Sequence, residues 1–190
     1  MNKVTVQDIS FQPLLDQPAE VLEQIRLMRN SDSVRRYMYN EHEISTEEHA
    51  AWLNGLRHNA NERFMVVQYR QVVVGVVALR SIRWADKTAD WAFYLDESVQ
   101  GKGVGGVVEY KLLQMVFFEM ELQKLNCEVL ETNPAVIAMH QRFGFAVEGV
   151  RRANIFKNGR RLDVYLLGIL LEDWVGIRSR FSKLFGDDSQ

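Results

Sequence analysis

The residues of this 190-residue sequence best suited to chemistry form a glycine-rich run between an expected strand and an expected helix. The run reads Gln100-Gly101-Lys102-Gly103-Val104-Gly105-Gly106. Glycines allow several backbone N–H groups to turn toward one point, and the start of a helix adds the positive end of its dipole. The run therefore predicts a site for phosphate or pyrophosphate, although its spacing matches neither the P-loop nor the dinucleotide-binding loop. A tight turn whose glycines serve packing alone is the alternative.

A second run of interest follows after the next expected strand. It reads Asn133-Pro134-Ala135-Val136-Ile137-Ala138-Met139-His140-Gln141-Arg142-Phe143-Gly144-Phe145. Pro134 suits the first position of a helix, because the N–H that it lacks would have no partner there. This expected helix carries His140, seven residues after Asn133 and four before Gly144.

Together the two runs resemble the signatures Q/R-x-x-G-x-G/A and N-x-x-A-I-x-L-Y-x-x-x-G-F of the GNAT acetyltransferases. The resemblance covers about residues 64–170, and the signatures occur in the family's order. It implies an α+β fold in which a mixed, mostly antiparallel sheet is flanked by helices, with a cleft between the central parallel strands. It also implies an enzyme that transfers an acetyl group from acetyl-CoA, its co-substrate, to an amine.

The resemblance assigns roles to the matching residues. The glycine-rich run cradles the pyrophosphate of CoA, and Asn133 holds the pantetheine arm. A backbone N–H on the strand before the loop polarises the thioester carbonyl, which places this role within Phe93-Tyr94-Leu95. Tyr94 is accordingly an expected catalytic residue, and the expected acetyl-CoA contacts are Phe93, Leu95, Gln100, Gly101, Lys102, Gly103, Val104, Gly105, Gly106 and Asn133.

His140 stands where the family signature has a tyrosine, which is usually proposed to protonate the departing CoA thiolate. Proton transfer from an imidazolium (pKa near ~6.5) to a thiolate (thiol pKa near ~8.5) is downhill, so a histidine can serve as this acid. At pH 7, however, only roughly a quarter of an unperturbed histidine is protonated. Two alternatives are a neutral His140 that hydrogen-bonds the sulfur, and a His140 on the helix surface with water as the acid.

An amine with a pKa near ~10 must lose a proton before or during its attack on the thioester, so a base is needed. Glu128 is the expected base, because it lies on the strand just before Asn133, which borders the expected cleft. An exposed strand glutamate without a catalytic role is the alternative. Cys127 is the single cysteine, so no internal disulfide or cysteine metal cluster is expected, nor any other metal site. We expect Cys127 to pack as a small core residue instead of carrying the acyl group.

The first third of the chain covers the acceptor side of the cleft in GNAT folds. Its pattern R-N…V-R-x-x-M…I-S-x-E-E-H resembles the nucleotide-sugar N-acetyltransferases of the pseudaminic acid pathway. That family acetylates the 4-amino group of UDP-4-amino-4,6-dideoxy-N-acetyl-β-L-altrosamine, a sugar destined for flagellin. Arginines can pair with the UDP diphosphate, and aromatic side chains can pack on the deoxy-sugar or the uracil. The expected acceptor residues are Arg29, Asn30, Met38, Tyr39, His49 and Trp52.

Other interpretations of the same residues stay open. Met38 and Trp52 could pack in the core beneath the helices, with Arg35 and Arg36 in solvent. A ribosomal-protein or peptide N-terminal acetyltransferase would place a peptide on the same early helices. A GNAT-like module without catalysis could bind CoA as a sensor. A polyamine acceptor is less favoured, because the first third of the chain is not strongly acidic.

Periodicity and turn signals predict the elements that position these residues. The expected strands are 4–11, 64–69, 72–82, 88–95 and 126–130, followed by a hairpin around Asn158-Gly159. The expected helices are 19–29, 46–57 after a capping box at Ser45, 107–122, 134–143 and 172–185. The last helix has one apolar face, and we expect that face to pack on its own sheet.

The length fits one domain over residues 1–190. The net charge of −2 gives no reason to expect binding to nucleic acid or to an anionic membrane. The sequence shows neither a signal peptide nor a membrane span, so we expect a cytoplasmic protein, monomeric or homodimeric.

Overall fold

Seven strands form one sheet in the computed structural model, which describes residues 3–187. Their order is β1-β2-β3-β4-β5-β7-β6, and β4 with β5 is the parallel pair among these otherwise antiparallel neighbours. The expected α+β class with a mixed, mostly antiparallel sheet is confirmed. The strands are β1 Ile9–Pro13, β2 Arg63–Tyr69, β3 Val72–Arg83, β4 Thr88–Leu95, β5 Lys124–Leu130, β6 Ala146–Lys157 and β7 Arg160–Leu170.

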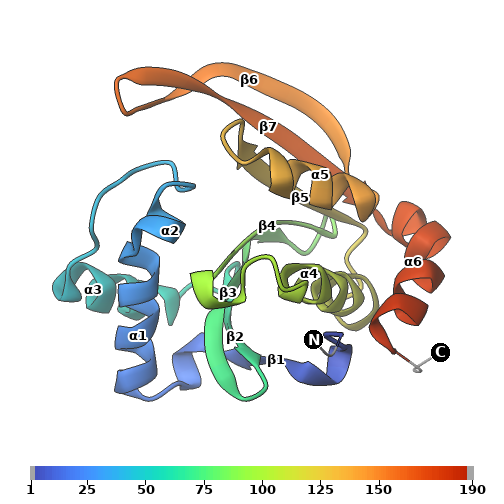
Figure 1. Ribbon diagram of the computed structural model, residues 1–190, viewed down its shortest axis with the longest axis horizontal. Coiled ribbons are helices and arrows are strands. Elements are labelled where there is room, and N and C mark those ends of the chain that lie inside the picture. The colour runs from blue at the N-terminus through green and yellow to red at the C-terminus, as the bar shows by residue number, and fades with distance from the viewer. Residues whose placement is uncertain (1–2, 188–190) are drawn as a thin grey trace.

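Helices cover both faces of the sheet (Figure 1). The α-helices are α1 Ala19–Asn30, α2 Asp32–Arg35, α3 Thr46–Leu56, α4 Val104–Gln114, α5 Pro134–Arg142 and α6 Leu171–Phe185. Short 3-10 turns are η1 Val6–Asp8, η2 Leu14–Asp16 and η3 Glu97–Val99, and the π-helical turn η4 Met115–Glu119 continues α4. No helix within residues 3–187 is both long and apolar enough to cross a membrane.

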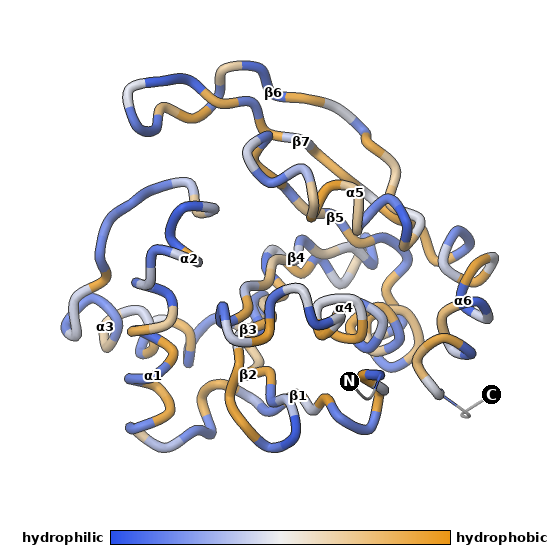
Figure 2. The backbone as a smooth tube through the Cα atoms, viewed as in Figure 1, coloured by the Kyte–Doolittle hydropathy of each residue, from blue (hydrophilic) through white to orange (hydrophobic). Residues whose placement is uncertain are grey.

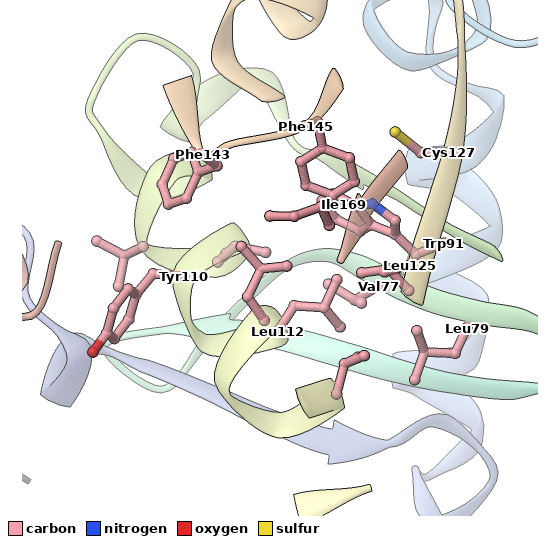
Figure 3. Close-up of a cluster of buried hydrophobic side chains, with 14 of the residues drawn as sticks. Val77, Leu79, Trp91, Tyr110, Leu112, Leu125, Cys127, Phe143, Phe145 and Ile169 are labelled. Atoms are coloured by element: carbon pink, nitrogen blue, oxygen red, sulfur yellow. The ribbon is translucent and has the colours of Figure 1, made fainter. Parts of the chain in front are cut away.

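Successive side chains of β2 and β3 point to opposite faces of the sheet, so these strands contribute to the core on both faces. Val66 and Val76 pack with Ile25 of α1 on one face, while the adjacent Val77 belongs to the larger cluster beneath α4. Figure 3 shows part of that larger cluster, with Leu112 of α4 among the buried side chains. Apolar residues accordingly concentrate in the central strands and α4, whereas the connection between α2 and α3 is mostly hydrophilic (Figure 2).

The last helix packs within its own chain, as expected. Phe143, at the end of α5, stacks on Phe181 of α6 with ring centroids 4.2 Å apart. Trp174 of α6 is fully buried and meets Tyr110 of α4 edge-on, with centroids 5.6 Å apart. Aromatic packing therefore joins α4, α5 and α6 into one layer.

β4 and β5 stay together over only three residue pairs, the last of which joins Asp90 with Asn126. Beyond this point β4 continues to Leu95 against β3, and β5 continues to Leu130 against β7. The two strands therefore part into a fork, and within residues 3–187 their facing backbone edges have no partner strand. Because α4 follows β4 and α5 follows β5, the N-termini of both helices lie at the open end of this fork.

Local signals located most element boundaries correctly. Arg70 and Gln71 have φ angles of 50° and 67°, and Asn158 and Gly159 have φ angles of 50° and 74°. Positive φ at both central residues is what a two-residue hairpin turn requires, and the two pairs join β2 to β3 and β6 to β7. The predicted capping box at Ser45 begins α3.

The starts of two elements differ most from the prediction. The first strand begins only at Ile9, because the Asp8 carboxylate accepts a hydrogen bond from the backbone N–H of Thr5 at 2.9 Å and stabilises the turn η1. α4 begins at Val104, three residues early, because Gly103 adopts a left-handed conformation with φ of 84° and lets the chain enter the helix at once.

Gly75 of β3 lies very close to the backbone of β4. A Cβ at this residue would lie 2.2 Å from the carbonyl oxygen of Tyr94 on β4. We predict that Gly75→Ala lowers the free energy of unfolding by about 3 kcal/mol, because backbone atoms must move. Gly55→Ala in α3 is the matched control, since its Cβ would meet no atom within 4 Å; it should raise stability by about 0.5–1 kcal/mol. Urea unfolding measures both, and equal stability of the two variants would contradict this close approach.

Candidate active site

The fork exposes the backbone edge of β4. Asp96, directly after β4, donates its N–H to the carbonyl of Val74 on β3 at 2.7 Å. N–H groups alternate between the two sides of a strand, so the N–H of Tyr94 also points to β3, and those of Phe93 and Leu95 point into the fork. This corrects the expectation for Tyr94, whose N–H is taken by the ladder. Phe93 and Leu95 are the candidates for polarising a carbonyl.

The glycine-rich loop borders open space next to this edge. Gly101 and Gly103 have φ angles of 72° and 84°, and a Cβ at either residue would meet no atom within 4 Å. These two glycines therefore allow a backbone shape and a close approach, and they do not serve packing. Gly103 precedes the first turn of α4, whose N–H groups have no partners within the helix. The loop fits a pyrophosphate group.

Gly105 and Gly106 lie in the first turn of α4 and do serve packing. A Cβ at Gly105 would lie 3.7 Å from the sulfur of Met139 on α5, and one at Gly106 would lie 3.4 Å from Phe185 of α6. The small size of these glycines brings the start of α4 close to both neighbouring helices. For them the packing interpretation fits the structure better than direct contact with a cofactor.

The other expected cofactor residues differ in what they can offer. The Gln100 side chain donates to the backbone carbonyl of Leu95 at 3.1 Å and so closes the loop onto the end of β4. The side chain of Val104 is fully buried, so only its backbone can reach a ligand. Lys102 is exposed. Asn133 precedes α5 without capping it through its side chain, which leaves this amide available to a ligand.

His140 lies inside the protein at the base of the fork and not on the helix surface. Its ring meets Trp91, the first residue of β4 after the last pair with β5, with centroids 5.1 Å apart. Its Nδ1 lies 2.8 Å from Oε1 of Glu109, a fully buried residue of α4. Burial raises the pKa of the Glu109 carboxyl, and the neighbouring imidazole opposes that rise. With Nδ1 engaged, Nε2 is the nitrogen left for another partner.

Glu128 is exposed on β5, and its carboxylate has two partners from elsewhere in the chain. Arg151 of β6 donates to Oε1 at 2.7 Å, and the Tyr39 hydroxyl donates to Oε2. The fold thus brings the expected base and one expected acceptor residue together. Burial, followed by this hydrogen bond, raises the pKa of Tyr39 and keeps the phenol protonated. To accept a proton from an amine or a water, Glu128 must exchange one of these partners.

Arg29, in the last turn of α1, is half-buried and forms no ion pair with the residues that the structure describes. Among the described residues, no acceptor forms a hydrogen bond with its Nη1. Burial lowers its pKa, and the phenol of Tyr94 partly offsets this effect. Tyr94 therefore directs its side chain to the α1 and α3 face of the sheet, where burial raises its own pKa. Because an unpaired buried cation is costly, the position suits an anionic ligand.

Lys157, at the end of β6, anchors the segment that follows α2. Its Nζ donates to the backbone carbonyls of Arg35, Arg36 and Met38 at 3.0, 2.9 and 2.7 Å. Figure 1 shows the β6–β7 hairpin reaching toward α2. A cavity of about 220 Å³ at this junction contains basic side chains and no carboxylate; it is lined by Arg36, Tyr37, Thr132, Lys157, Asn158, Arg160 and Leu162.

A second, larger cavity of mixed charge adjoins the same segment. Its volume is about 590 Å³, and it is lined by Asp32, Ser33, Arg35, Arg36, Glu41 and Glu97. Arg35 already pairs with Asp32 at 2.7 Å and with Glu43 at 2.6 Å. Arg36 lines both cavities and stacks over the ring of Tyr37, 4.9 Å from its centroid. It forms no ion pair within 4.0 Å among residues 3–187.

Asn30 and His49 hold the scaffold, which corrects the expectation that they face the acceptor. The Asn30 amide donates to the carbonyl of Ile44 and accepts from its N–H, both at 2.9 Å. His49 is buried and stacks on Trp52 with ring centroids 5.4 Å apart, and burial lowers its pKa. Trp52 meets Phe64 of β2 at 5.0 Å and so packs at the edge of the core. Arg29, Met38 and Tyr39 are left as candidates.

Sequence reasoning missed four residues that now stand out. Glu109 is a lone carboxylate in the apolar run of α4, and this isolation was a usable signal. Arg36 was considered as part of a polar segment, with a solvated side chain as the alternative, but was not among the expected acceptor residues. Lys157 and Arg160 flank a hairpin turn, and no local pattern indicates that this turn reaches residues more than a hundred positions earlier.

Comparison with known proteins agrees with this geometry. Residues 20–166 match the family described as acetyltransferase (GNAT) domain. Spermidine N(1)-acetyltransferase of Vibrio cholerae is 28% identical over 77% of this chain and 85% of that protein. Acetyltransferase PseH of Campylobacter jejuni is 21% identical over 68% of this chain and 79% of that protein.

A solved structure shows the same fold. The crystal structure of spermidine N-acetyltransferase from Vibrio cholerae in complex with CoA and spermine matches with a TM-score of 0.81 at 24% sequence identity. The match covers 89% of this chain and 99% of that chain. It confirms the expected fold, and the match to the GNAT acetyltransferase family agrees with acetyl-CoA as the co-substrate.

The open space at Gly103 leads to a prediction about the co-substrate. Gly103→Val should raise the dissociation constant of acetyl-CoA at least about tenfold, because the side chain enters the space beside the pyrophosphate donors. Gly186→Val is the matched control: Gly186 caps α6 with a φ of 66°, far along the chain from the loop, so this variant carries similar backbone strain. Isothermal titration calorimetry on both folded variants distinguishes the effects. Equal weakening by both would show that strain alone is responsible.

Proposed function

Because this chain belongs to the acetyltransferase (GNAT) domain family and is an acetyl-CoA-dependent N-acetyltransferase, we propose that its acceptor is an amino sugar linked to a nucleoside diphosphate. The specific candidate is UDP-4-amino-4,6-dideoxy-N-acetyl-β-L-altrosamine of pseudaminic acid synthesis, as the resemblance in the first third of the chain suggests. The observation that carries the proposal is the half-buried Arg29, whose buried Nη1 has no hydrogen-bond partner among the described residues, beside the basic cavity at Arg36, Lys157 and Arg160.

The charges on the acceptor side favour an anion. Arg29 lies close enough to Arg35 and Lys157 for their charges to oppose one another. The Lys157 ammonium is bonded to backbone carbonyls, and Arg35 is bonded to carboxylates. Arg29 and Arg36 are left to bind an incoming diphosphate, for which a guanidinium offers paired donors. A polyamine would bring a further positive charge to the same place.

The fork supplies groups for direct transfer. With the pyrophosphate at the glycine-rich loop, the thioester lies along the free edge of β4, where the N–H of Phe93 or Leu95 can stabilise the developing oxyanion. The 4-amino group attacks the thioester carbon, the C–S bond breaks, and His140 donates the Nε2 proton to the thiolate. Glu128 is the proposed acceptor for the proton that the amine loses, directly or through water.

One observation favours a second candidate, a polyamine. Three carboxylates, from Asp32, Glu41 and Glu97, line the larger cavity, and spermidine N-acetyltransferases are among the similar proteins. However, Asp32 is bonded to Arg35 and Glu41 accepts a hydrogen bond from Asn158. Two of the three carboxylates are thus already engaged, so fewer carboxylates are free to bind a cation in this cavity than its composition suggests.

A panel of acceptors tests the proposal. CoA release is measured with a thiol reagent in the presence of the UDP-amino sugar, spermidine, peptides ending in Ala or Ser, or no acceptor. The proposal predicts the highest kcat/KM with the UDP-amino sugar. Turnover of spermidine or of a peptide in its place would transfer the assignment to that class. Turnover of no acceptor would favour a CoA-binding module without catalysis.

Arg29 gives the matching prediction for a single residue. Arg29→Ala should weaken binding of the UDP-sugar by about 1.5–3 kcal/mol, the scale of a charged hydrogen bond. Binding of acetyl-CoA should not be weakened. The control is Arg178→Ala, which removes an arginine of α6 that stacks over the ring of Phe118 in η4. Calorimetry with each ligand measures the difference. Loss of acetyl-CoA affinity in Arg29→Ala, or none for the UDP-sugar, would refute the diphosphate contact.

His140 leads to a prediction about pH. His140→Phe should lower kcat by about 10²-fold or more and leave the affinity for acetyl-CoA nearly unchanged. If an imidazolium is the acid, wild-type kcat falls at high pH, and His140→Tyr should restore activity there because a phenol stays protonated up to about pH 10. Steady-state kinetics over pH 6–9 tests both points. Wild-type turnover by His140→Phe across this range would leave water as the proton source.

A further inference from the structure

We propose that Glu109 is the positioning residue of the acid His140: its buried carboxylate accepts Nδ1–H and so dedicates Nε2 to the CoA sulfur. This inference deepens the proposed function and rests on the role that it gives to His140. Glu109 belongs to α4 and His140 to α5, the two helices that begin at the open end of the fork. The contact therefore couples the imidazole to the helix that follows the glycine-rich loop.

Burial of Glu109 and His140 costs more free energy than a purely structural role would justify. Both side chains are almost completely buried, at 3% exposed for His140 and 0% for Glu109. Aromatic rings of Trp91, Phe93 and Phe145 surround the imidazole. Apolar residues of similar volume would fill such a space at lower cost, because removing two ionisable groups from water takes several kcal/mol per ion. The second carboxylate oxygen of Glu109 has no hydrogen-bond partner among the described residues, which adds to that cost.

The geometry fixes which nitrogen can react. When Nδ1 donates to a carboxylate, a neutral imidazole has a bare Nε2, and a protonated imidazole carries its transferable proton on Nε2. During transfer, the bond from sulfur to the acetyl carbon breaks and the electron pair stays on sulfur. The Nε2 proton then moves to that sulfur, and His140 returns to the neutral form with its Nδ1 proton still held by Glu109. The proton lost by the amine restores the imidazolium through solvent.

The carboxylate also supplies a charge opposite to the imidazolium. Two other titratable groups face the pair: Arg142, on the same helix as His140, and Cys127 of β5, whose thiol pKa is raised first of all by burial. The thiol is neutral and the guanidinium is positive, so Glu109 supplies the negative charge in contact with the imidazole. Removing this charge should move the high-pH fall of kcat to lower pH.

Kinetics of Glu109→Gln tests the inference, with Glu119→Gln at an exposed position of the following turn as the matched control. We expect kcat of Glu109→Gln to fall about 10- to 100-fold with both KM values nearly unchanged, and the high-pH limb to move to lower pH. Adding Glu109→Gln to His140→Phe should cost little more, because Glu109 acts through the imidazole. An additive loss in the double variant, or wild-type kinetics in Glu109→Gln, would overturn the role.

A spectroscopic measurement keeps the test independent of variant folding and of the acceptor. Nitrogen NMR of wild-type protein with labelled histidine reports which ring nitrogen carries the proton at high pH, and the His140→Phe spectrum assigns the signal among the four histidines. The inference predicts the Nδ1–H tautomer. An Nε2–H tautomer would show that a protonated Glu109 is the donor and would overturn it. If the tautomer is as predicted and no acceptor is turned over, the proposed function fails instead.

Discussion

The parting of β4 and β5 beyond Asp90 and Asn126 is the constraint on which the site depends. A parallel pair that continued would satisfy the backbone of both strands and leave nothing for a ligand. Here β3 and β7 hold the outer edges, so the inner edges separate without loss of the sheet. The fork gives a ligand what a bound strand would otherwise receive, a row of backbone donors and acceptors. It also places the N-termini of α4 and α5 at one opening, where their dipoles and free N–H groups favour a phosphorylated co-substrate.

Two interactions across the chain complete this frame from opposite faces. Beneath the fork, the contact between Glu109 and His140 joins α4 to α5 within an otherwise apolar and aromatic cluster. On the acceptor side, Lys157 ties the β6–β7 hairpin to the carbonyls at the end of α2. The first interaction fixes a group that can move a proton. In the proposed function, the second fixes the wall on the acceptor side, and the bonds of the lysine to backbone carbonyls leave the arginines to bind the acceptor. In the proposed function, one interaction thus serves proton transfer and the other serves binding of the acceptor.

Sequence alone predicted what local physics determines. The turn at Asn158-Gly159, the capping box at Ser45 and the strand bounds of β4 each depend on a few neighbouring residues. Gly103 borders open space, whereas Gly105 packs on Met139. This difference depends on where α4 begins, so the motif alone does not predict it. Asn30 looked like a ligand contact because nothing in the sequence shows that its amide matches the backbone of Ile44. Likewise, the alternation that removes Tyr94 from the donor edge depends on pairing with β3. The roles of these residues depend on contacts with residues distant in the sequence.

Amide hydrogen exchange tests most directly whether the free edge of β4 receives acetyl-CoA. NMR can follow Phe93, Tyr94 and Leu95 individually in the full chain with and without CoA. The Tyr94 amide should be protected in both states, since it bonds to β3. Phe93 and Leu95 should exchange readily in the free protein, and at least one of them should become protected when CoA binds. A Tyr94 amide that exchanges freely without CoA, or no change at Phe93 and Leu95 on binding, would contradict the fork as the site of the thioester.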